Sequence, residues 1–207
     1  MLKLILDLDN TIYPVSDIGE KLFAPLFELL NSPEYNLADT IIEDAKKQIM
    51  RIPFQKVAEQ FNFPAELTDK ALNLLRSLTY DEEMSYFKDY ELIKDLDTPK
   101  FLLTTGFRNL QESKIRSLKI QDDFTEIFVI DPDTSEMTKK DAMIHIMDKY
   151  KLLPTDLLVV GDDPESEIKA AKELGIASFL LDTNNIYPDS QADYTGKSLK
   201  EVLSNIG

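Results

Sequence analysis

Two aspartates separated by one residue follow the first apolar run of the chain, in the segment LDLDNT at residues 6–11. If residues 2–6 form a strand, Asp7 and Asp9 project from its end on the same side. Two like charges this close are costly unless a cation or a proton lies between them. The pair therefore suits a divalent cation together with nucleophilic and acid–base chemistry. The alternative is a strand that stops at an Asp-Asn turn.

A second apolar run, FLLTTG at residues 101–106, ends in Thr104, Thr105 and Gly106. Hydroxyl groups and exposed backbone N–H groups together form a neutral binding site for phosphate oxygens. A third cluster, Thr138-Lys139-Lys140-Asp141, begins a helical pattern. Lysines at a helix N-terminus oppose the preference of the helix dipole, which predicts a nearby anion. A strand-end turn and an exposed lysine pair are the respective alternatives.

A fourth cluster follows the apolar run at 157–160 and contains Asp162, Asp163, Glu165 and Glu167. Acidic residues in the first turn of a helix often serve only the helix dipole, which would explain the two glutamates. The same reasoning explains the adjacent aspartates less well. Carboxylate oxygens at the end of a strand are suitable ligands for Mg²⁺.

The elements that must position these clusters follow an alternating pattern. Strand-like runs at 100–104, 126–130, 157–160 and 177–181 alternate with helical patterns near 107–118, 138–150 and 164–174. This alternation predicts an α/β fold with a Rossmann-like parallel-sheet core.

A helical block without a convincing strand separates the first strand from the others. The spacing of Asp17 and Glu20 predicts a capping box at its start. We predict a core of residues 1–14 plus 88–207 and an inserted helical cap of residues 15–87. Such an insert would lie over the carboxyl ends of the strands, where open α/β sheets bind ligands, and would act as a lid.

The amino-acid composition limits the kinds of partner that the protein is expected to bind. The 207 residues include 38 acidic and 23 basic side chains, for a formal charge of −15, which disfavours nucleic acid and anionic membranes. There is no cysteine and no apolar stretch of the ~20 residues needed to cross a bilayer. We therefore expect a cytoplasmic protein, and the oligomeric state stays open. An anionic substrate would need a local positive site, such as a metal, a lysine or backbone N–H groups.

The order and spacing of the four clusters resemble the haloacid dehalogenase-like (HAD) hydrolase superfamily over nearly the whole chain. The segment Asp7–Thr11 looks like the first motif, Thr104 the second, Lys139 the third, and Gly161-Asp162-Asp163 with Glu167 the fourth. The helical insert resembles the C1 cap of that superfamily, and residues 9–14 are similar to pyrimidine 5′-nucleotidase-like members. The sequence departs from the family pattern at Thr105, where Asn is common, and at Lys140, where Pro is usual.

The resemblance implies a Mg²⁺-dependent phosphatase that acts on a small phosphomonoester, such as a nucleoside monophosphate or a sugar phosphate. It implies that Asp7 attacks phosphorus to form an aspartyl-phosphate, and that Asp9 protonates the leaving oxygen and then activates water. The implied metal ligands are Asp7, the Asp9 carbonyl and Asp162, with Asp163 or Glu167 close behind. The implied phosphate-binding residues are Thr104, Thr105 and Lys139.

Several alternatives stay open at this point. A phosphomutase would keep the same four clusters, and a non-catalytic binding or regulatory member would keep the fold without the activity. A phospho-signalling receiver would be about half as long and would carry its aspartate further along the chain. Cap residues would select the substrate, but Phe23 and Phe54 are more typical of a helical core, and Arg51 of an exposed surface charge.

Overall fold

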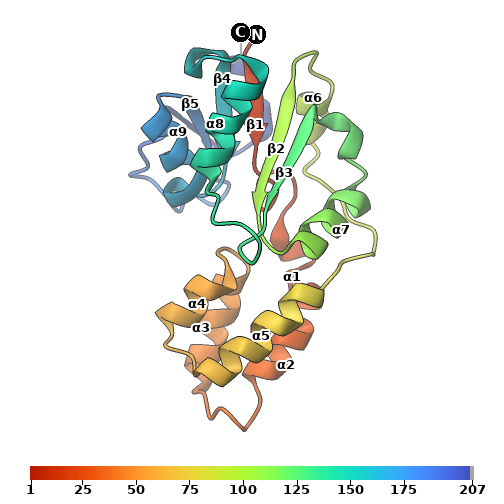
Figure 1. The fold of residues 1–207 in the computed structure, drawn as a ribbon, viewed down its shortest axis with the longest axis vertical. Coiled ribbons are helices and arrows are strands. Elements are labelled where there is room, and N and C mark those ends of the chain that lie inside the picture. The colour runs from red at the N-terminus through yellow and green to blue at the C-terminus, as the bar shows by residue number, and fades with distance from the viewer. Residues whose placement is uncertain (206–207) are drawn as a thin grey trace.

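The core of the protein is a six-stranded sheet in which every pair of neighbouring strands is parallel, seen in a computed structural model that describes residues 1–205. The spatial order is β3-β2-β1-β4-β5-β6 (Figure 1). The strands are β1 (Lys3–Leu6), β2 (Lys100–Thr105), β3 (Glu126–Ile130), β4 (Leu157–Gly161), β5 (Ala177–Leu181) and β6 (Tyr194–Gly196). The predicted parallel α/β core is confirmed. The sequence analysis missed β6, which is three residues long and mostly exposed.

Both faces of the sheet are covered by helices. Leu4 and Leu6 of β1 pack in one apolar cluster with α7 (Arg108–Leu118), whereas Ile5 packs in another with α8 (Lys139–Tyr150) and α9 (Lys169–Leu174). A strand buried on both sides needs apolar residues at every position. This is why the central strands read as continuous apolar runs rather than alternating ones.

The segment between β1 and β2 forms a separate helical lobe, drawn below the sheet in Figure 1. Its helices are α1 (Gly19–Leu22), α2 (Ala24–Leu30), α3 (Asp39–Ile49), α4 (Phe54–Gln60) and α5 (Ala65–Ser77). The chain returns to the sheet through α6 (Tyr90–Lys94). This is the inserted helical cap that the sequence predicts. The limits 15–87 for the cap stay a prediction, and residues 206–207 of the predicted core lie outside the described residues.

One local prediction is wrong, and another is confirmed with a difference in detail. The capping box at Asp17 and Glu20 does not form, because Val15–Asp17 is a short 3-10 helix and α1 begins only at Gly19. The helical pattern predicted near 164–174 is present, but its first part, Pro164–Ile168, is a π-helical turn that precedes α9. This wider turn is the one that carries Glu167 into the core.

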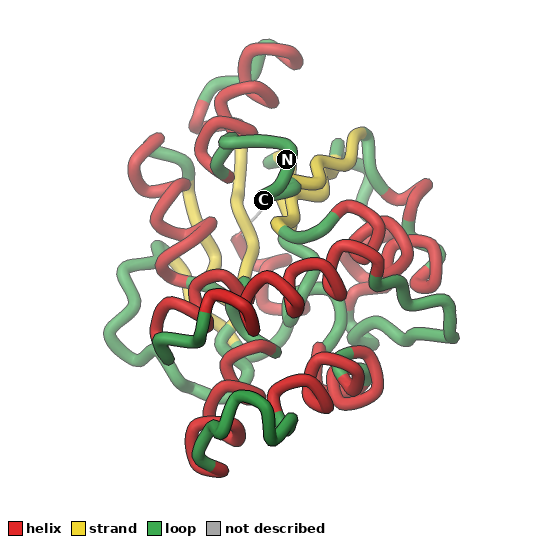
Figure 2. Tube along the Cα trace, turned by 60° about the horizontal axis from the view of Figure 1, so that its bottom comes forward, coloured by secondary structure: helices red, strands yellow, loops and turns green. Residues whose placement is uncertain are grey.

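The cap is tied to the core through α7 and the loop after β3. The backbone of Tyr80 donates to Ser113 Oγ at 2.8 Å, and Ser117 Oγ donates to the Tyr80 carbonyl at 2.9 Å. Arg76 of α5 pairs through two nitrogens with Asp133. Figure 2, which brings the cap forward, shows α5 crossing the molecule beneath the sheet. These contacts fix the cap over the carboxyl ends of β1 and β2.

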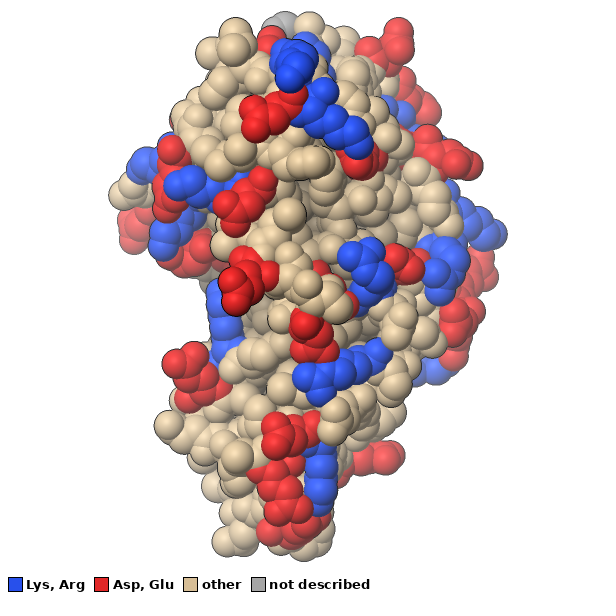
Figure 3. Space-filling view, in the orientation of Figure 1, with Lys and Arg blue, Asp and Glu red and all other residues tan. Residues whose placement is uncertain are grey.

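Charged side chains are spread over both lobes on the face shown in Figure 3, with Asp and Glu interspersed among Lys and Arg. Within residues 1–205, the helices lack the combination of length and apolar character that crossing a membrane requires.

Candidate active site

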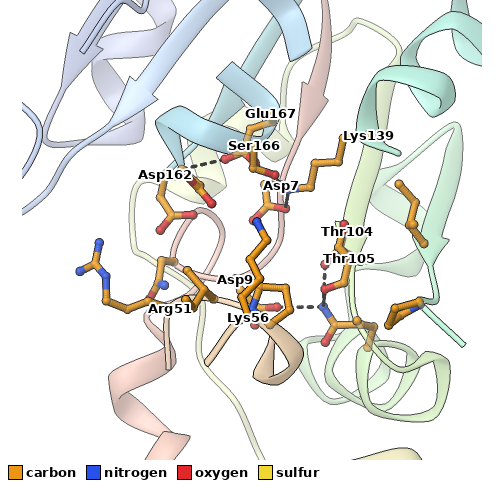
Figure 4. A pocket seen from close by; sticks show the side chains of 18 of the residues that line it. Asp7, Asp9, Arg51, Lys56, Thr104, Thr105, Lys139, Asp162, Ser166 and Glu167 are labelled. Atoms are coloured by element: carbon orange, nitrogen blue, oxygen red, sulfur yellow. Dashed lines mark hydrogen bonds and ion pairs between the residues drawn. The ribbon is translucent and has the colours of Figure 1, made fainter. Parts of the chain in front are cut away.

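A cavity of about 560 Å³ lies between the sheet and the cap, and all of the predicted site residues line it. They are Asp7, Asp9, Thr104, Thr105, Lys139, Asp162, Asp163 and Glu167. The residues come from the ends of β1, β2 and β4 and from the start of α8 (Figure 4). Because parallel strands end at one edge of the sheet, clusters far apart in sequence meet there.

Three carboxylates form the centre of the site. Oxygen atoms of Asp7, Asp162 and Glu167 lie within 4.8 Å of one another. Lys139 Nζ donates to Asp7 Oδ1 at 2.5 Å and to Glu167 Oε2 at 2.7 Å, with its side chain 10% exposed. One ammonium group therefore faces two buried carboxylates, Asp7 and Glu167, and the half-buried Asp162, so negative charge remains in excess.

Glu167 reaches this centre because Gly161 leaves room for it. A methyl group added at Gly161 would lie 2.1 Å from Glu167 Oε1 and 2.3 Å from its Cγ. The inner oxygen of Glu167 also accepts the backbone N–H of Asp163 at 2.9 Å. The glycine at the end of β4 thus serves a close side-chain approach.

The side chain of Asp163 caps a helical turn, whereas that of Glu167 lies in the carboxylate cluster. Its Oδ1 accepts the backbone N–H of Glu165 at 2.9 Å, so the side chain caps the π-helical turn. Burial and Glu167 raise the pKa of Asp163, while the Glu165 N–H, Lys139 and Lys56 oppose this rise. Of the two candidates left open by the sequence, Glu167 is the one that joins Asp7 and Asp162.

Burial is the main influence on the titration of the central carboxylates. It raises the pKa of Asp7 to about 7; Lys139 opposes the rise, and Glu167 and Asp9 add to it. Burial, Glu167 and Asp7 raise the pKa of Asp162 well above its ordinary value. The pKa of Lys139 is also raised, because attraction to Asp7 and Glu167 outweighs the effect of burial. The site as a whole favours an added proton or an added cation.

Asp9 has the opposite environment. Lys114 Nζ donates to its Oδ1 at 2.7 Å, Gln111 Nε2 donates to its Oδ2 at 2.8 Å, and the Tyr13 hydroxyl also donates to Oδ1. Burial alone would raise the pKa of Asp9, but Lys114, Gln111 and Tyr13 together hold it below the ordinary value. Asp9 is therefore a carboxylate fixed by three donors.

Sequence reasoning missed those three donors. A signal for two of them exists: Gln111 and Lys114 lie three residues apart on the apolar face of α7 and are 2% and 3% exposed. Polar residues at positions of a helix that should face the core need partners, because unpaired buried polar groups are costly. Tyr13, fully buried just after the aspartate pair, carries no comparable signal.

Thr104, Thr105 and Lys140 also line the cavity, but they differ in their partners. Gln111 Nε2 donates to Thr104 Oγ1 at 2.6 Å, which connects Thr104 to Asp9, and Thr105 lines the cavity beside it. Lys140 lines the cavity too, but its ammonium donates to Glu173 at 2.7 Å.

The chain belongs to the haloacid dehalogenase-like hydrolase family, whose profile matches residues 4–181. The chain is similar in fold to a predicted phosphatase from Clostridium acetobutylicum, with a TM-score of 0.75, 16% identity and coverage of 99% of this chain and 97% of that one. A haloacid dehalogenase-like family hydrolase from Streptococcus pneumoniae has a TM-score of 0.74 at 17% identity, covering 100% and 99%.

A HAD-hydrolase from Bacillus subtilis, whose structure was determined bound to magnesium, matches with a TM-score of 0.68 at 18% identity, covering 99% and 98%. Two dehalogenase structures also match, each with a TM-score of 0.58. Among curated proteins, none matches the sequence. The structural likenesses support the fold, and the family profile establishes the membership.

The donor set at the centre fits a hard divalent cation. Magnesium binds through one or two carboxylates and retains several waters, and the cluster of Asp7, Asp162 and Glu167 offers three carboxylates in a small volume. Lys139 already neutralises part of the charge, so a cation would remove the remaining excess rather than create a new imbalance.

We expect Asp7→Asn to raise the thermal stability of the metal-free protein at about pH 8 and to raise it by less at about pH 5, which is closer to the ordinary pKa of the group. The folded-state pKa of about 7 exceeds the ordinary 3.8, so the stability linked to this group is present at low pH and is lost as the pH rises through the folded value. Thermal unfolding in EDTA at both pH values measures this. Asp148→Asn, on the exposed surface of α8, is the control. A less stable Asp7→Asn protein at the higher pH would contradict the charge excess.

We expect Gly161→Ala to lower the free energy of unfolding by about 1–3 kcal/mol, because the new methyl group must displace Glu167. Urea denaturation measures the loss. Gly175→Ala is the comparison: Gly175 has φ +69° and open space around it, so only backbone strain of about 1–2 kcal/mol applies. The stability that magnesium adds should fall in Gly161→Ala and persist in Gly175→Ala. Equal magnesium responses in both variants would show that Glu167 is not held as described.

Proposed function

We propose that this protein is a magnesium-dependent phosphatase that hydrolyses a small phosphomonoester through an aspartyl-phosphate on Asp7. The observation that carries the proposal is the meeting of Asp7, Asp162, Glu167 and Lys139 in one cavity that also contains Asp9. Such a set offers a nucleophile, a cation site and a second carboxylate for proton transfer. Family membership and the phosphatase names of similar structures support the same class.

The nucleophile is the carboxylate of Asp7, at the end of the central strand of the core. In the first step one of its oxygens forms a bond to phosphorus, and the bond from phosphorus to the leaving oxygen breaks. Lys139 and the Thr104 hydroxyl are placed to bind the oxygens of the transferring group. Bound Mg²⁺, held by Asp7, Asp162 and Glu167 with the Asp9 carbonyl, would supply charge stabilisation for phosphoryl transfer.

Asp9 is the proton-transfer group. The leaving oxygen needs a proton in the first step, and the attacking water loses one in the second, so the same carboxyl group gives and then recovers a proton. The three donors around Asp9 favour its ionised form. We therefore infer that Asp9 is in the correct ionisation state to act as a base in the second step. In the first step Asp9 must instead carry a proton, so we infer that esters with poor leaving groups react slowly in that step.

The substrate is proposed to be a small molecule, since the cavity volume of about 560 Å³ lies within the usual range for such ligands. The sequence resemblance suggests a nucleoside monophosphate or a sugar phosphate. The cap closes one side of the cavity with residues from α3, α4 and α5 and from the connecting segments, and these groups would discriminate between leaving groups.

Phosphate release from p-nitrophenyl phosphate tests the proposed activity. We expect turnover with Mg²⁺, loss of turnover in EDTA and loss in Asp7→Asn. Chromatography of a sugar phosphate after incubation distinguishes hydrolysis from a mutase reaction, because a mutase yields an isomer rather than free phosphate. Turnover that persists in Asp7→Asn would overturn the nucleophile assignment.

We expect Asp9→Asn to reduce kcat by about 100- to 10,000-fold for an alkyl phosphate, since general acid–base catalysis contributes that much. The reduction should be smaller in the first step for p-nitrophenyl phosphate, whose leaving group needs little protonation. Rapid-mixing measurements of the nitrophenolate burst isolate that step. An equal loss for both esters would show that Asp9 does not protonate the leaving oxygen.

A further inference from the structure

Six cationic side chains line the cavity, and four of them have carboxylate partners. The partnered ones are Lys114 with Asp9, Lys139 with Asp7 and Glu167, Lys140 with Glu173, and Lys169 with Glu165. The two that remain are Arg51 and Lys56. Within residues 1–205, neither forms an ion pair with a carboxylate.

Both unpaired cations belong to the cap segment formed by residues 50–56, which runs from the end of α3 into α4. Figure 4 shows Lys56 extending from α4 into the cavity toward Asp7. Its ammonium also acts on the carboxylate of Asp163, on the opposite wall. The Lys56 side chain therefore extends into the space between the cap and the core, and its ammonium group forms no hydrogen bond among the described residues.

Arg51 has a fixed position at the side of the same cavity. Its Nη2 donates to the Tyr187 hydroxyl at 2.8 Å, and its guanidinium lies 5.8 Å from the centre of the Tyr187 ring. Tyr187 belongs to the core, so this contact bridges cap and core. A guanidinium group retains further N–H donors after one such contact and suits carboxylate or phosphate oxygens.

The remaining cap residues that line the cavity are mostly apolar. They are Val15, Phe23, Ile49, Met50, Ile52, Pro53, Phe54 and Leu75, with Gln55 as the uncharged polar exception. Arg51 and Lys56 are thus the charged groups that the cap contributes to the cavity. A protein with a formal charge of −15 attracts anions only where cations are placed locally.

We propose that Arg51 and Lys56 bind a second anionic group, a carboxylate or a second phosphate, on the part of the substrate that leaves. The proposal rests on the phosphatase function described above and narrows it to phosphorylated acids or bisphosphates. A nucleoside monophosphate or a simple sugar phosphate carries no second anion. The transferring phosphate would have its own ligands in the core, whereas the two cap cations line other parts of the cavity, Lys56 reaching toward Asp7 and Arg51 lying exposed at its edge.

Three esters of one chain length test the proposal: hydroxypropyl phosphate, the phosphate ester of hydroxypropanoate, and propanediol bisphosphate. The first has a neutral leaving group, and the others carry a carboxylate and a second phosphate. We expect kcat/KM for at least one anionic ester to exceed that for the neutral ester by about 10-fold or more, the effect of a charge-assisted hydrogen bond. Comparison of the two anionic esters identifies which group is preferred.

Variants of the cap cations connect this preference to particular residues. Lys56→Met and Arg51→Met should each lower kcat/KM for the preferred anionic ester about 10- to 100-fold and for the neutral ester by a smaller factor. Lys56→Arg should retain most of the preference. Lys47→Met is the matched control, since Lys47 is an exposed cap lysine on α3 that pairs with Asp44 outside the cavity.

Calorimetric binding of the same esters to the Asp7→Asn protein should show the same order without turnover. Equal losses for neutral and anionic esters in Lys56→Met would overturn the proposal and leave the phosphatase function intact, as would the absence of any preference in the parent protein. Failure of every ester to react with Mg²⁺ would instead contradict the proposed function, and this inference with it.

Discussion

The arrangement of the site depends on one electrostatic constraint: two buried carboxylates and one half-buried carboxylate surround a single ammonium group. Lys139 bonds to Asp7 and Glu167, yet Asp162 completes a cluster whose negative charge it cannot balance. Desolvated like charges are costly, so such a cluster favours a proton or a cation. Burial raises the pKa of Asp7 to about 7, and the nearby carboxylates of Glu167 and Asp9 add to this rise. A divalent cation would relieve the excess of negative charge and leave Asp7 ionised for attack.

The fold creates this cluster of charges by bringing together residues that are distant in sequence. In the parallel sheet, β1 and β4 lie side by side and end at the same edge. Their paired positions run from Lys3 with Leu157 to Leu6 with Val160. The residues that follow each strand are therefore neighbours. Gly161 then allows Glu167 to fold back beneath the end of the strand. The cap covers this edge and supplies mostly apolar side chains with two cations. In the proposed function, the reacting groups and the groups that recognise the leaving group therefore lie on opposite walls of the cavity.

The sequence predicts those features that depend on local patterns. Apolar runs alternating with helical periodicity are sufficient for the core and the inserted cap, and acidic residues at strand ends locate the site. The choice between Asp163 and Glu167 could not be predicted, because it depends on a π-helical turn and on the space at Gly161. The environment of Asp9 was missed because it depends on α7, about a hundred residues later, where the buried Gln111 and Lys114 face the aspartate.

Magnesium binding measured by titration calorimetry at neutral pH tests the central claim most directly. The carboxylate cluster predicts one Mg²⁺ site per chain, loss of that binding in Asp162→Asn, and unchanged binding in Asp148→Asn on the surface of α8. Absence of binding to the parent protein, or binding that is unaffected by Asp162→Asn, would contradict the account.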